Sequence, residues 1–224
     1  MIVRETEPIA LIGGAHVEGA HLAAVLRLAP VLVAADGGAD AALAAGLMPR
    51  AVIGDFDSIS DAARARLSAD ILHPMDDQDT TDFEKCLAHV AAPLLIGLGF
   101  MGDRLDHHMA ACNALVRHAA QRCILMGGAD LMFLCPPSLS LPLAEGCRIS
   151  LFPMGAVEGV SDGLRWPIGG MTFSPDGRIG TSNLAQGAVS LTVTAPKMLV
   201  MLPADTLAIV AGALRDAPAR WSPE

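Results

Sequence analysis

The sequence has few charged residues, and the positive ones are the minority. Lys and Arg together number 15 against 24 Asp and Glu, which gives a formal net charge of −9 at pH 7. A general nucleic-acid binder needs a basic face, so that class of function is not expected. Only 17% of the 224 residues are charged and 52% are hydrophobic. The chain can therefore bury a sizeable core, as one large domain or two small ones, and is not expected to be disordered.

Paired cysteine motifs are also missing. The cysteines are odd in number and scattered, with no C-x-x-C pair: Cys86, Cys112, Cys123, Cys135 and Cys147. Neither a disulfide framework nor a zinc site is expected from this pattern. Reduced thiols in a cytosolic protein are the better interpretation.

Long apolar runs of the kind that cross membranes are missing too. No uncharged apolar stretch reaches the roughly 18 to 20 residues that a spanning helix needs. The start of the chain, MIVRETEPIALIGG, mixes charges into its first residues and lacks a basic segment followed by a long apolar one. We therefore expect a soluble, cytoplasmic protein with no signal peptide and no membrane partner.

Short apolar runs alternate with helix-forming segments through about the first 127 residues. The runs that we expect to be strands are 8–14, 31–36, 51–55, 70–74, 93–99 and 123–128. Continuous apolar strands separated by helices indicate a parallel sheet that is covered on both faces. In such sheets, ligands bind beyond the carboxyl ends of the strands. We expect this α/β part to occupy residues 1–135.

The sequence changes character after residue 130. The segment CPPSLSLPLAEG (135–146) is rich in Pro and Ser and is typical of a linker or crossing loop. Short β-prone segments follow it, broken by Gly, Pro and Asp-Gly: 147–154, 163–168, 171–175, 178–183 and 188–195. They predict an all-β module over residues 136–224. The tail TLAIVAGALRDA (206–217) fits either a strand or a short helix.

A glycine-rich turn, GLGFMG (97–102), matches the dinucleotide fingerprint G-x-G-x-x-G. It follows the fifth predicted strand rather than the first, no acid lies about 20 residues further on, and the next residues are polar. A nicotinamide dinucleotide is therefore a weak hypothesis, while binding of another phosphate at this turn stays open. Arg104, just after the turn, is suited to clamp a phosphate. The P-loop motif G-x-x-x-x-G-K-[ST] is absent.

The segment VIGDFDSI (52–59) ends a predicted buried strand on two carboxylates, Asp55 and Asp57. A strand repeats every two residues, so both would lie on one face, close enough to repel each other. Asp36 ends the preceding strand, and DDQDTTDFE (76–84) follows the next one. Negative charge gathered on one rim destabilises a site unless a cation offsets it. Magnesium, which binds one or two carboxylates together with phosphate oxygens and water, is the economical answer.

Some of these polar residues also have structural explanations. Asp36, placed before two glycines, is typical of a turn. Thr81 and Glu84 fit the helix-capping pattern S/T-x-x-E. His107 and His108 are adjacent, so on a helix they would point about 100° apart and could not share a metal. We expect surface or capping roles for these two histidines.

Several motifs together resemble the thiamine pyrophosphokinase family, in its order and spacing and over about residues 10–200. They are ADGGAD (35–40), LAAGLMPRAVIGDFDSI (43–59), QDTTDFEKCL (78–87), GDRLDHHMAACNAL (102–115) and the later GLRWPI and TSN. The resemblance implies transfer of pyrophosphate from ATP to the hydroxyethyl arm of thiamine, with release of AMP. It also implies a homodimer with shared active sites. Each chain would have a Rossmann-like parallel-sheet domain for the nucleotide, followed by an all-β sandwich for thiamine binding and dimerisation.

The resemblance also implies roles for particular residues. The catalytic residues, which would hold Mg²⁺, are Asp55, Asp57 and Asp82. The ATP site would be lined by Asp36, Gly37, Gly38, Ser58, Thr81, Arg104 and Asp106. The residues that would contact thiamine are Gln78, Asp79, Trp166, Ser182 and Asn183. Attack at the β-phosphorus needs metal-neutralised oxygens and an in-line alcohol, with little covalent work from the protein.

The chain departs from the family pattern at Asp103 and at Ala111, which stands where the bacterial motif usually has asparagine, and two other classes of function stay open. Asp103 replaces a glycine of the usual bacterial motif and could weaken the hold of Arg104 on phosphate. A metal-dependent phosphohydrolase could use the same acids, although no water-activating base stands out. A nucleotide or thiamine sensor would not need so many acids. Without the resemblance, Trp166 before Pro167 would be interpreted as a core anchor.

Overall fold

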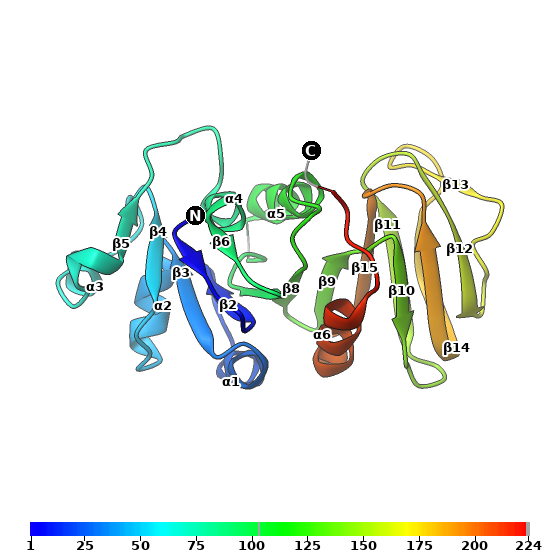
Figure 1. Cartoon of the computed structure of the whole chain (residues 1–224), viewed down its shortest axis with the longest axis horizontal. Helices are drawn as coiled ribbons and strands as arrows, with labels where there is room; N and C mark the ends of the chain where they lie inside the picture. The colour runs from blue at the N-terminus through cyan, green and yellow to red at the C-terminus, as the bar shows by residue number, and fades with distance from the viewer. Residues whose placement is uncertain (103, 223–224) are drawn as a thin grey trace. The chain divides into compact units, whose positions relative to one another are not determined.

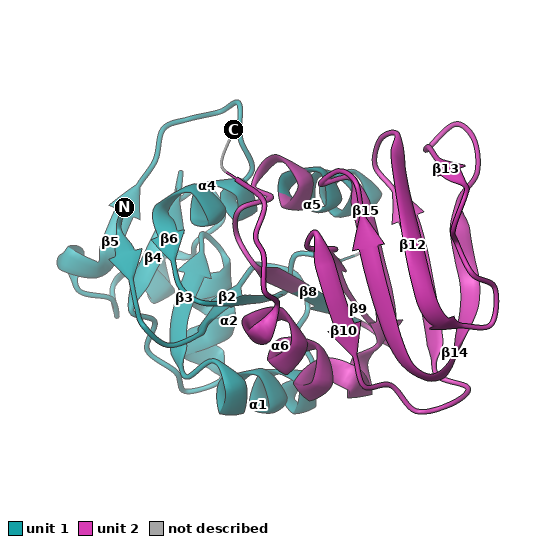
Figure 2. Ribbon diagram, turned by 45° about the vertical axis from the view of Figure 1, so that its right-hand side comes forward, with its two compact units in different colours: residues 1–114, 125–127 teal, residues 115–124, 128–224 magenta. Residues whose placement is uncertain are grey.

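The computed structural model describes residues 1–102 and 104–222 of the chain (Figure 1). It is an α/β protein with a large mixed β-sheet. Two compact units can be separated, one of residues 1–114 and 125–127 and the other of residues 115–124 and 128 onward (Figure 2). Among the described helices, none combines the length and the hydrophobicity of a membrane-spanning segment.

Parallel strands lie side by side in the sheet of the first unit, as the printed pairings of five of them show. In spatial order they are β7 (Leu95–Leu98), β2 (Ile9–Ile12), β3 (Val31–Ala35), β4 (Ala51–Gly54) and β5 (Leu72–Pro74). Strands β7, β2 and β4 are buried at every residue. Burial on both faces removes the apolar–polar alternation of a half-exposed strand, which is why these segments are unbroken apolar runs in the sequence. These five strands are among the segments that were expected to be strands, and their pairing is parallel, as expected.

Helices alternate with these strands, as predicted. They are α1 (Gly19–Leu28), α2 (Gly38–Ala44), α3 (Asp61–Arg64), α4 (Asp82–His89) and α5 (Leu105–Arg117). The Thr81 Oγ accepts a hydrogen bond of 3.3 Å from the Glu84 amide, which confirms the predicted cap of α4. Helix α4 ends at His89 because the chain continues into β6 (Val90–Ala91), which pairs with β1 (Val3–Arg4). Strand β8 (Cys123–Gly127) follows α5, as predicted.

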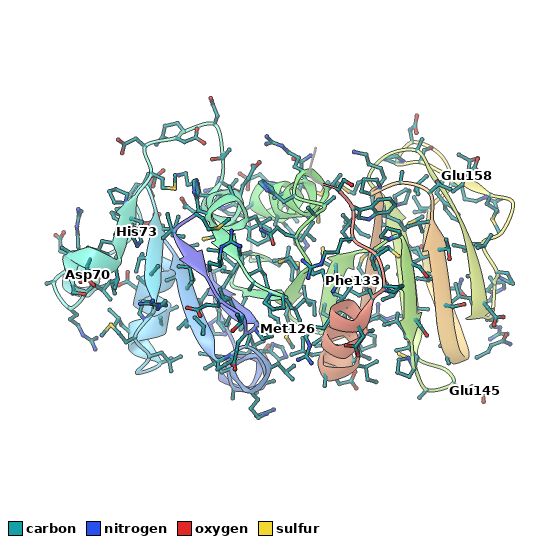
Figure 3. The ribbon with its side chains drawn as sticks, in the orientation of Figure 1. Asp70, His73, Met126, Phe133, Glu145 and Glu158 are labelled. Atoms are coloured by element: carbon teal, nitrogen blue, oxygen red, sulfur yellow. The ribbon has the colours of Figure 1, made fainter. Side chains whose placement is uncertain are left out.

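Antiparallel strands make up most of the second unit. They are β9 (Asp130–Leu134), β10 (Ser138–Leu141), β11 (Arg148–Pro153), β12 (Val157–Leu164), β13 (Thr172–Phe173), β14 (Gly180–Val193) and β15 (Met198–Pro203). Strand β14 is long enough to pair with β10, β11 and β12 along its length. Phe133 on β9 is fully buried, whereas Glu145 and Glu158 are exposed (Figure 3).

Two sequence expectations for this unit need revision. The segment 135–146 is not simply a linker, because it contains β10. The two β-prone segments 178–183 and 188–195 belong largely to one strand, β14. The tail, which fitted either a strand or a helix, forms α6 (Leu207–Asp216). The expected boundary at residue 135 stays a prediction.

Gly38, the first residue of α2, illustrates how closely that helix approaches the sheet. A Cβ atom at Gly38 would overlap the carbonyl oxygen of Ile12, the last residue of β2. We expect Gly38→Ala to lower the free energy of unfolding by about 2 to 3 kcal/mol, because backbone must move to admit a methyl group. Gly19, at the start of α1, is the matched control, because a Cβ added there would meet no atom within 4 Å.

Urea denaturation of both variants measures this effect. Gly19→Ala should match the parent or exceed it slightly, because alanine restricts the unfolded chain and favours a helix. Equal stability of the Gly38→Ala variant and the parent would contradict the tight helix–strand approach.

Candidate functional site

Three carboxylates gather where β3 and β4 end. Asp36 directly follows β3, and Asp55 and Asp57 follow β4; the two strands are parallel neighbours, with Ala35 opposite Ile53. One oxygen from each of the three carboxylates lies within 4.8 Å of the others. The predicted rim of acids at adjacent strand ends is therefore present. Close carboxylates of this kind can hold a hard divalent cation.

Asp36 is the buried member of this cluster. Its residue surface is 1% exposed, and its carboxylate accepts hydrogen bonds from the backbone amides of Ser58 (3.0 Å) and Ile59 (3.2 Å). Burial raises the pKa of the Asp36 carboxyl to about 6; the Ser58 amide opposes this shift and the neighbouring Asp57 adds to it. Asp36 thus fixes the turn that carries Asp55 and Asp57.

The turn itself has an unusual backbone. Phe56, between the two acids, has φ of 65°, and Asp36 has φ of 42°. Both are non-glycine residues in the left-handed region, which is uncommon and costs energy, especially for a bulky side chain such as Phe. The Ser58 Oγ donates a 2.7 Å hydrogen bond to Asp57 on the same turn. The strained turn presents two carboxylates close together instead of separating them.

A cation, Lys85, lies beside Asp55 and Asp82, and it was not among the residues predicted from the sequence. Its Nζ atom lies 3.0 Å from Asp82 Oδ1 and 3.3 Å from Asp55 Oδ2, and its side chain is 2% exposed. Burial lowers the pKa of the ammonium, but Asp82 and Asp55 outweigh it and hold the pKa above its ordinary value. Lys85 lies three residues after Asp82, a spacing that puts the two side chains on the same helix face. That spacing was the available signal.

The pKa values of the two carboxylates that contact Lys85 shift in opposite directions. Burial raises the pKa of Asp82, and Lys85 only partly opposes the shift. Burial also acts on Asp55, but the Asp57 amide, Lys85 and Gln78 together hold its pKa below the ordinary value. The Gln78 Nε2 donates a 3.3 Å hydrogen bond to Asp55 Oδ2, so Gln78 is part of the same cluster. Asp79 is exposed on the adjoining loop.

The glycine-rich turn at 97–102 has a packing explanation. Gly99 has φ of +74°, and a Cβ there would lie 2.6 Å from the Gly13 carbonyl oxygen. A Cβ at Gly97 would lie 2.8 Å from the Leu125 side chain, and one at Gly102 would lie 2.6 Å from that of Ala15. These glycines allow close approach of neighbouring groups, which accounts for the fingerprint match without a dinucleotide.

Arg104 and Asp106 pair with each other rather than with the acid cluster. The Arg104 Nη2 lies 2.6 Å from Asp106 Oδ2, and both side chains are well exposed. The hydrogen bond from Arg104 lowers the pKa of the Asp106 carboxyl. His107 is exposed, as expected for a surface histidine, and His108 is half-buried. Asp103 lies outside the described residues.

The second unit places Trp166, Ser182 and Asn183 together. Asn183 on β14 is 5% exposed; its Nδ2 donates to the Trp166 carbonyl (2.8 Å), and its Oδ1 accepts from the Trp166 amide (3.2 Å). Ser182 has φ of 60° and donates its amide to Ser150 Oγ. Trp166 is 52% exposed, so it is not a core anchor, and the Arg165 guanidinium carbon lies 4.9 Å from its ring centroid. No sequence pattern pointed to that Arg165 contact.

Comparison with known families and proteins gives a consistent set of matches. A family model described as "Thiamin pyrophosphokinase, catalytic domain" matches residues 22–126. Thiamine pyrophosphokinase 1 of Oryza sativa subsp. japonica is 31% identical over 157 residues, which are 62% of this chain and 60% of the rice protein. Thiamine pyrophosphokinase 3 of the same plant is 30% identical over 172 residues, 68% of this chain and 64% of that protein. The chain thus spans less than two thirds of the length of these relatives.

Solved structures share the fold over most of the chain. Thiamine pyrophosphokinase from Bacillus subtilis has a TM-score of 0.72 at 19% identity, over 88% of this chain and 98% of that chain. Yeast thiamin pyrophosphokinase has a TM-score of 0.72 at 19% identity, over 91% of this chain and 88% of the yeast chain. At this level of identity the likeness is one of fold.

Proposed function

We propose that this chain is a thiamine pyrophosphokinase that transfers pyrophosphate from ATP to thiamine. The match to the family's catalytic domain and the similarity to curated thiamine pyrophosphokinases support the proposal, and the solved structures share the fold. The products are thiamine pyrophosphate and AMP. The observation that carries the proposal is the convergence of Asp36, Asp55 and Asp57 within 4.8 Å, inside the matched segment. Such a cluster can bind the metal that escorts a nucleotide phosphate.

The proposed metal is Mg²⁺, held by Asp55 and Asp57 together with Asp82, with Asp36 at the buried side of the cluster. The donor set fits a hard cation, because it consists of carboxylate oxygens drawn from two adjacent strand ends and a helix start. When bound, the ion would neutralise charge on the phosphate oxygens. The chain's own contribution is to hold these carboxylates in place and to bring the thiamine hydroxyl in line with the β-phosphorus.

The substrate contacts are part of the same proposal. For ATP they are Asp36, Gly37, Gly38, Ser58, Thr81, Arg104 and Asp106. For thiamine they are Gln78, Asp79, Trp166, Ser182 and Asn183. The exposed indole of Trp166 suits the cationic thiazolium ring through cation–π attraction. The buried amide of Asn183 contributes by holding the Trp166 backbone.

The proposal includes the architecture and the assembly. Residues 1–135 would form a Rossmann-like nucleotide-binding domain and residues 136–224 a β-sandwich that binds thiamine and dimerises. The parallel order of β7, β2, β3, β4 and β5 supports the first part, and the antiparallel strands of the second unit are compatible with a sandwich. The working form would be a cytoplasmic homodimer with shared active sites.

One assay tests the reaction. The protein is incubated with ATP, Mg²⁺ and thiamine, and the nucleotide products are separated by chromatography. AMP together with thiamine pyrophosphate is the expected result, and both should disappear when thiamine is omitted. ADP or free phosphate without thiamine pyrophosphate would indicate a phosphohydrolase instead, and no turnover would indicate a sensor.

Metal binding should depend on pH through Asp36. The pKa of Asp36 in the folded protein is about 6, above the ordinary 3.8. Protonation of Asp36 therefore adds to the free energy of unfolding, and this contribution is fully present below about pH 4 and is lost as the pH rises through 6. A divalent ion must displace that proton. We therefore expect the affinity for Mn²⁺ to fall by up to about tenfold per pH unit below 6 and to level off above pH 7.

Calorimetric titration of Mn²⁺ into the nucleotide-free protein at several pH values measures this dependence. Ordinary exposed carboxyls have finished titrating by about pH 5 and would not produce it. An affinity that stays constant between pH 5 and pH 7.5 would show that Asp36 does not compete with the metal.

A further inference from the structure

Lys85 is a buried ammonium group placed between two carboxylates of the acid cluster. Its side chain is 2% exposed, and its Nζ contacts Asp55, which follows β4, and Asp82, at the start of α4. Burying a lysine is costly unless its charge is paired and hydrogen-bonded. The two contacts satisfy that requirement, and they link the start of α4 to the end of β4.

The charge balance around Lys85 is uneven. Four carboxylates, those of Asp36, Asp55, Asp57 and Asp82, influence one another electrostatically, and Lys85 is the cation paired with two of them. Asp55 belongs both to this pair and to the cluster whose oxygens lie within 4.8 Å of one another. The ammonium and a divalent ion would therefore act on the same carboxylate.

We propose that Lys85 is a positioning residue that serves as the resident cation of the acid cluster. It holds Asp55 and Asp82 in place before a divalent ion binds, and it supplies part of the positive charge that the ion supplies afterwards. This inference rests on the metal site of the proposed function but not on the identity of the substrates.

Thermal unfolding with Mn²⁺ alone tests the proposal. Lys85→Met keeps most of the apolar stem and removes the charge, Lys85→Arg keeps the charge, and Lys197→Met removes the same charge from the chain's other lysine, in the second unit. In EDTA at pH 8, we expect Lys85→Met to melt about 5 °C or more below the parent, because two partly buried carboxylates lose their partner. Lys85→Arg should recover at least half of this loss, and Lys197→Met should melt within about 1 °C of the parent.

The decisive measurement is the same comparison in saturating Mn²⁺. The gap between Lys85→Met and the parent should shrink by at least half, because the ion takes over the missing charge. A gap of equal size with and without Mn²⁺ would overturn the proposal, because the ion would not then replace the Lys85 charge. No gap in EDTA would overturn it as well, because the Lys85 charge would then contribute nothing to stability. A parent whose melting temperature does not respond to Mn²⁺ would overturn it too.

A second variant covers the case in which Lys85→Met does not fold. Asp82→Asn combined with Lys85→Met removes one charge of each sign and should restore a folded protein, with a weaker response to Mn²⁺ than the parent because Asp82 is one of the proposed metal ligands. Failure of this double variant to fold would overturn the proposal, since charge balance would not be the requirement. None of these measurements uses ATP or thiamine. They can therefore support the role of Lys85 even if the AMP assay detects no reaction, and the AMP assay can be positive even if the role of Lys85 is refuted.

Discussion

Asp57→Asn should abolish turnover and leave the fold intact. Asp57 is exposed, its carboxylate accepts a hydrogen bond from the neighbouring Ser58 hydroxyl, and it lies within 4.8 Å of the carboxylates of Asp36 and Asp55. Loss of a metal ligand removes several kcal/mol of transition-state stabilisation, so the rate should fall by about 10³-fold or more. The variant should be as stable as the parent or more so, because one of three repelling charges is gone.

Steady-state AMP formation and thermal unfolding in EDTA together measure this outcome. Asp70→Asn is a matched control, because Asp70 (labelled in Figure 3) is an exposed aspartate on the short helical turn before β5, and the side chains that act on it are Ser68 and His73 rather than the acid cluster. It should keep its activity. A variant at Asp57 that melts far below the parent without metal and still turns over with Mg²⁺ would show that these acids are structural.

Buried strands were the most predictable part of the fold. Strands β2, β3, β4 and β7 are buried nearly throughout, so their sequences are continuous apolar runs that helices separate. Strand β10 was missed because prolines flank it, although Leu139 and Leu141 alternate with serines and are buried. Strands of two residues, such as β1, carry no periodic signal at all.

The sequence predicted the positions of the acidic residues in the candidate site, but not that of the lysine beside them. Asp36, Asp55 and Asp57 could be placed on one rim because parallel strands end together. The spacing of Lys85 from Asp82 indicates a pair on the same helix face, but the sequence does not place Lys85 beside Asp55, because only the packing of α4 beside β4 brings its ammonium there. The side-chain contact between Arg165 and Trp166 likewise depends on local geometry that the sequence pattern does not encode.

The Trp166→Ala and Asp57→Asn variants should each be nearly inactive. A mixture of the two should regain activity once their subunits have exchanged. Trp166 follows β12 in the second unit and is 52% exposed, so its ring has surface to offer to a ligand. If the proposed homodimer shares its active sites, each site combines the acids of one chain with the Trp166 of the other. A mixed dimer then has one site with both residues intact and one with neither. With random exchange, half of the dimers are mixed, so the mixture should reach about one quarter of the parent activity.

The complementation is informative only if exchange is demonstrated, which two different affinity tags on the parents allow. Trp221→Phe is the control for loss of an indole: Trp221 donates its Nε1–H to the Cys135 carbonyl and has no proposed contact with thiamine, so the variant should stay active. If mixed dimers form and the activity stays at the level of the parents, the acids and Trp166 of one chain serve the same site. In that case the dimer would not be required for catalysis, because each chain would supply its own tryptophan.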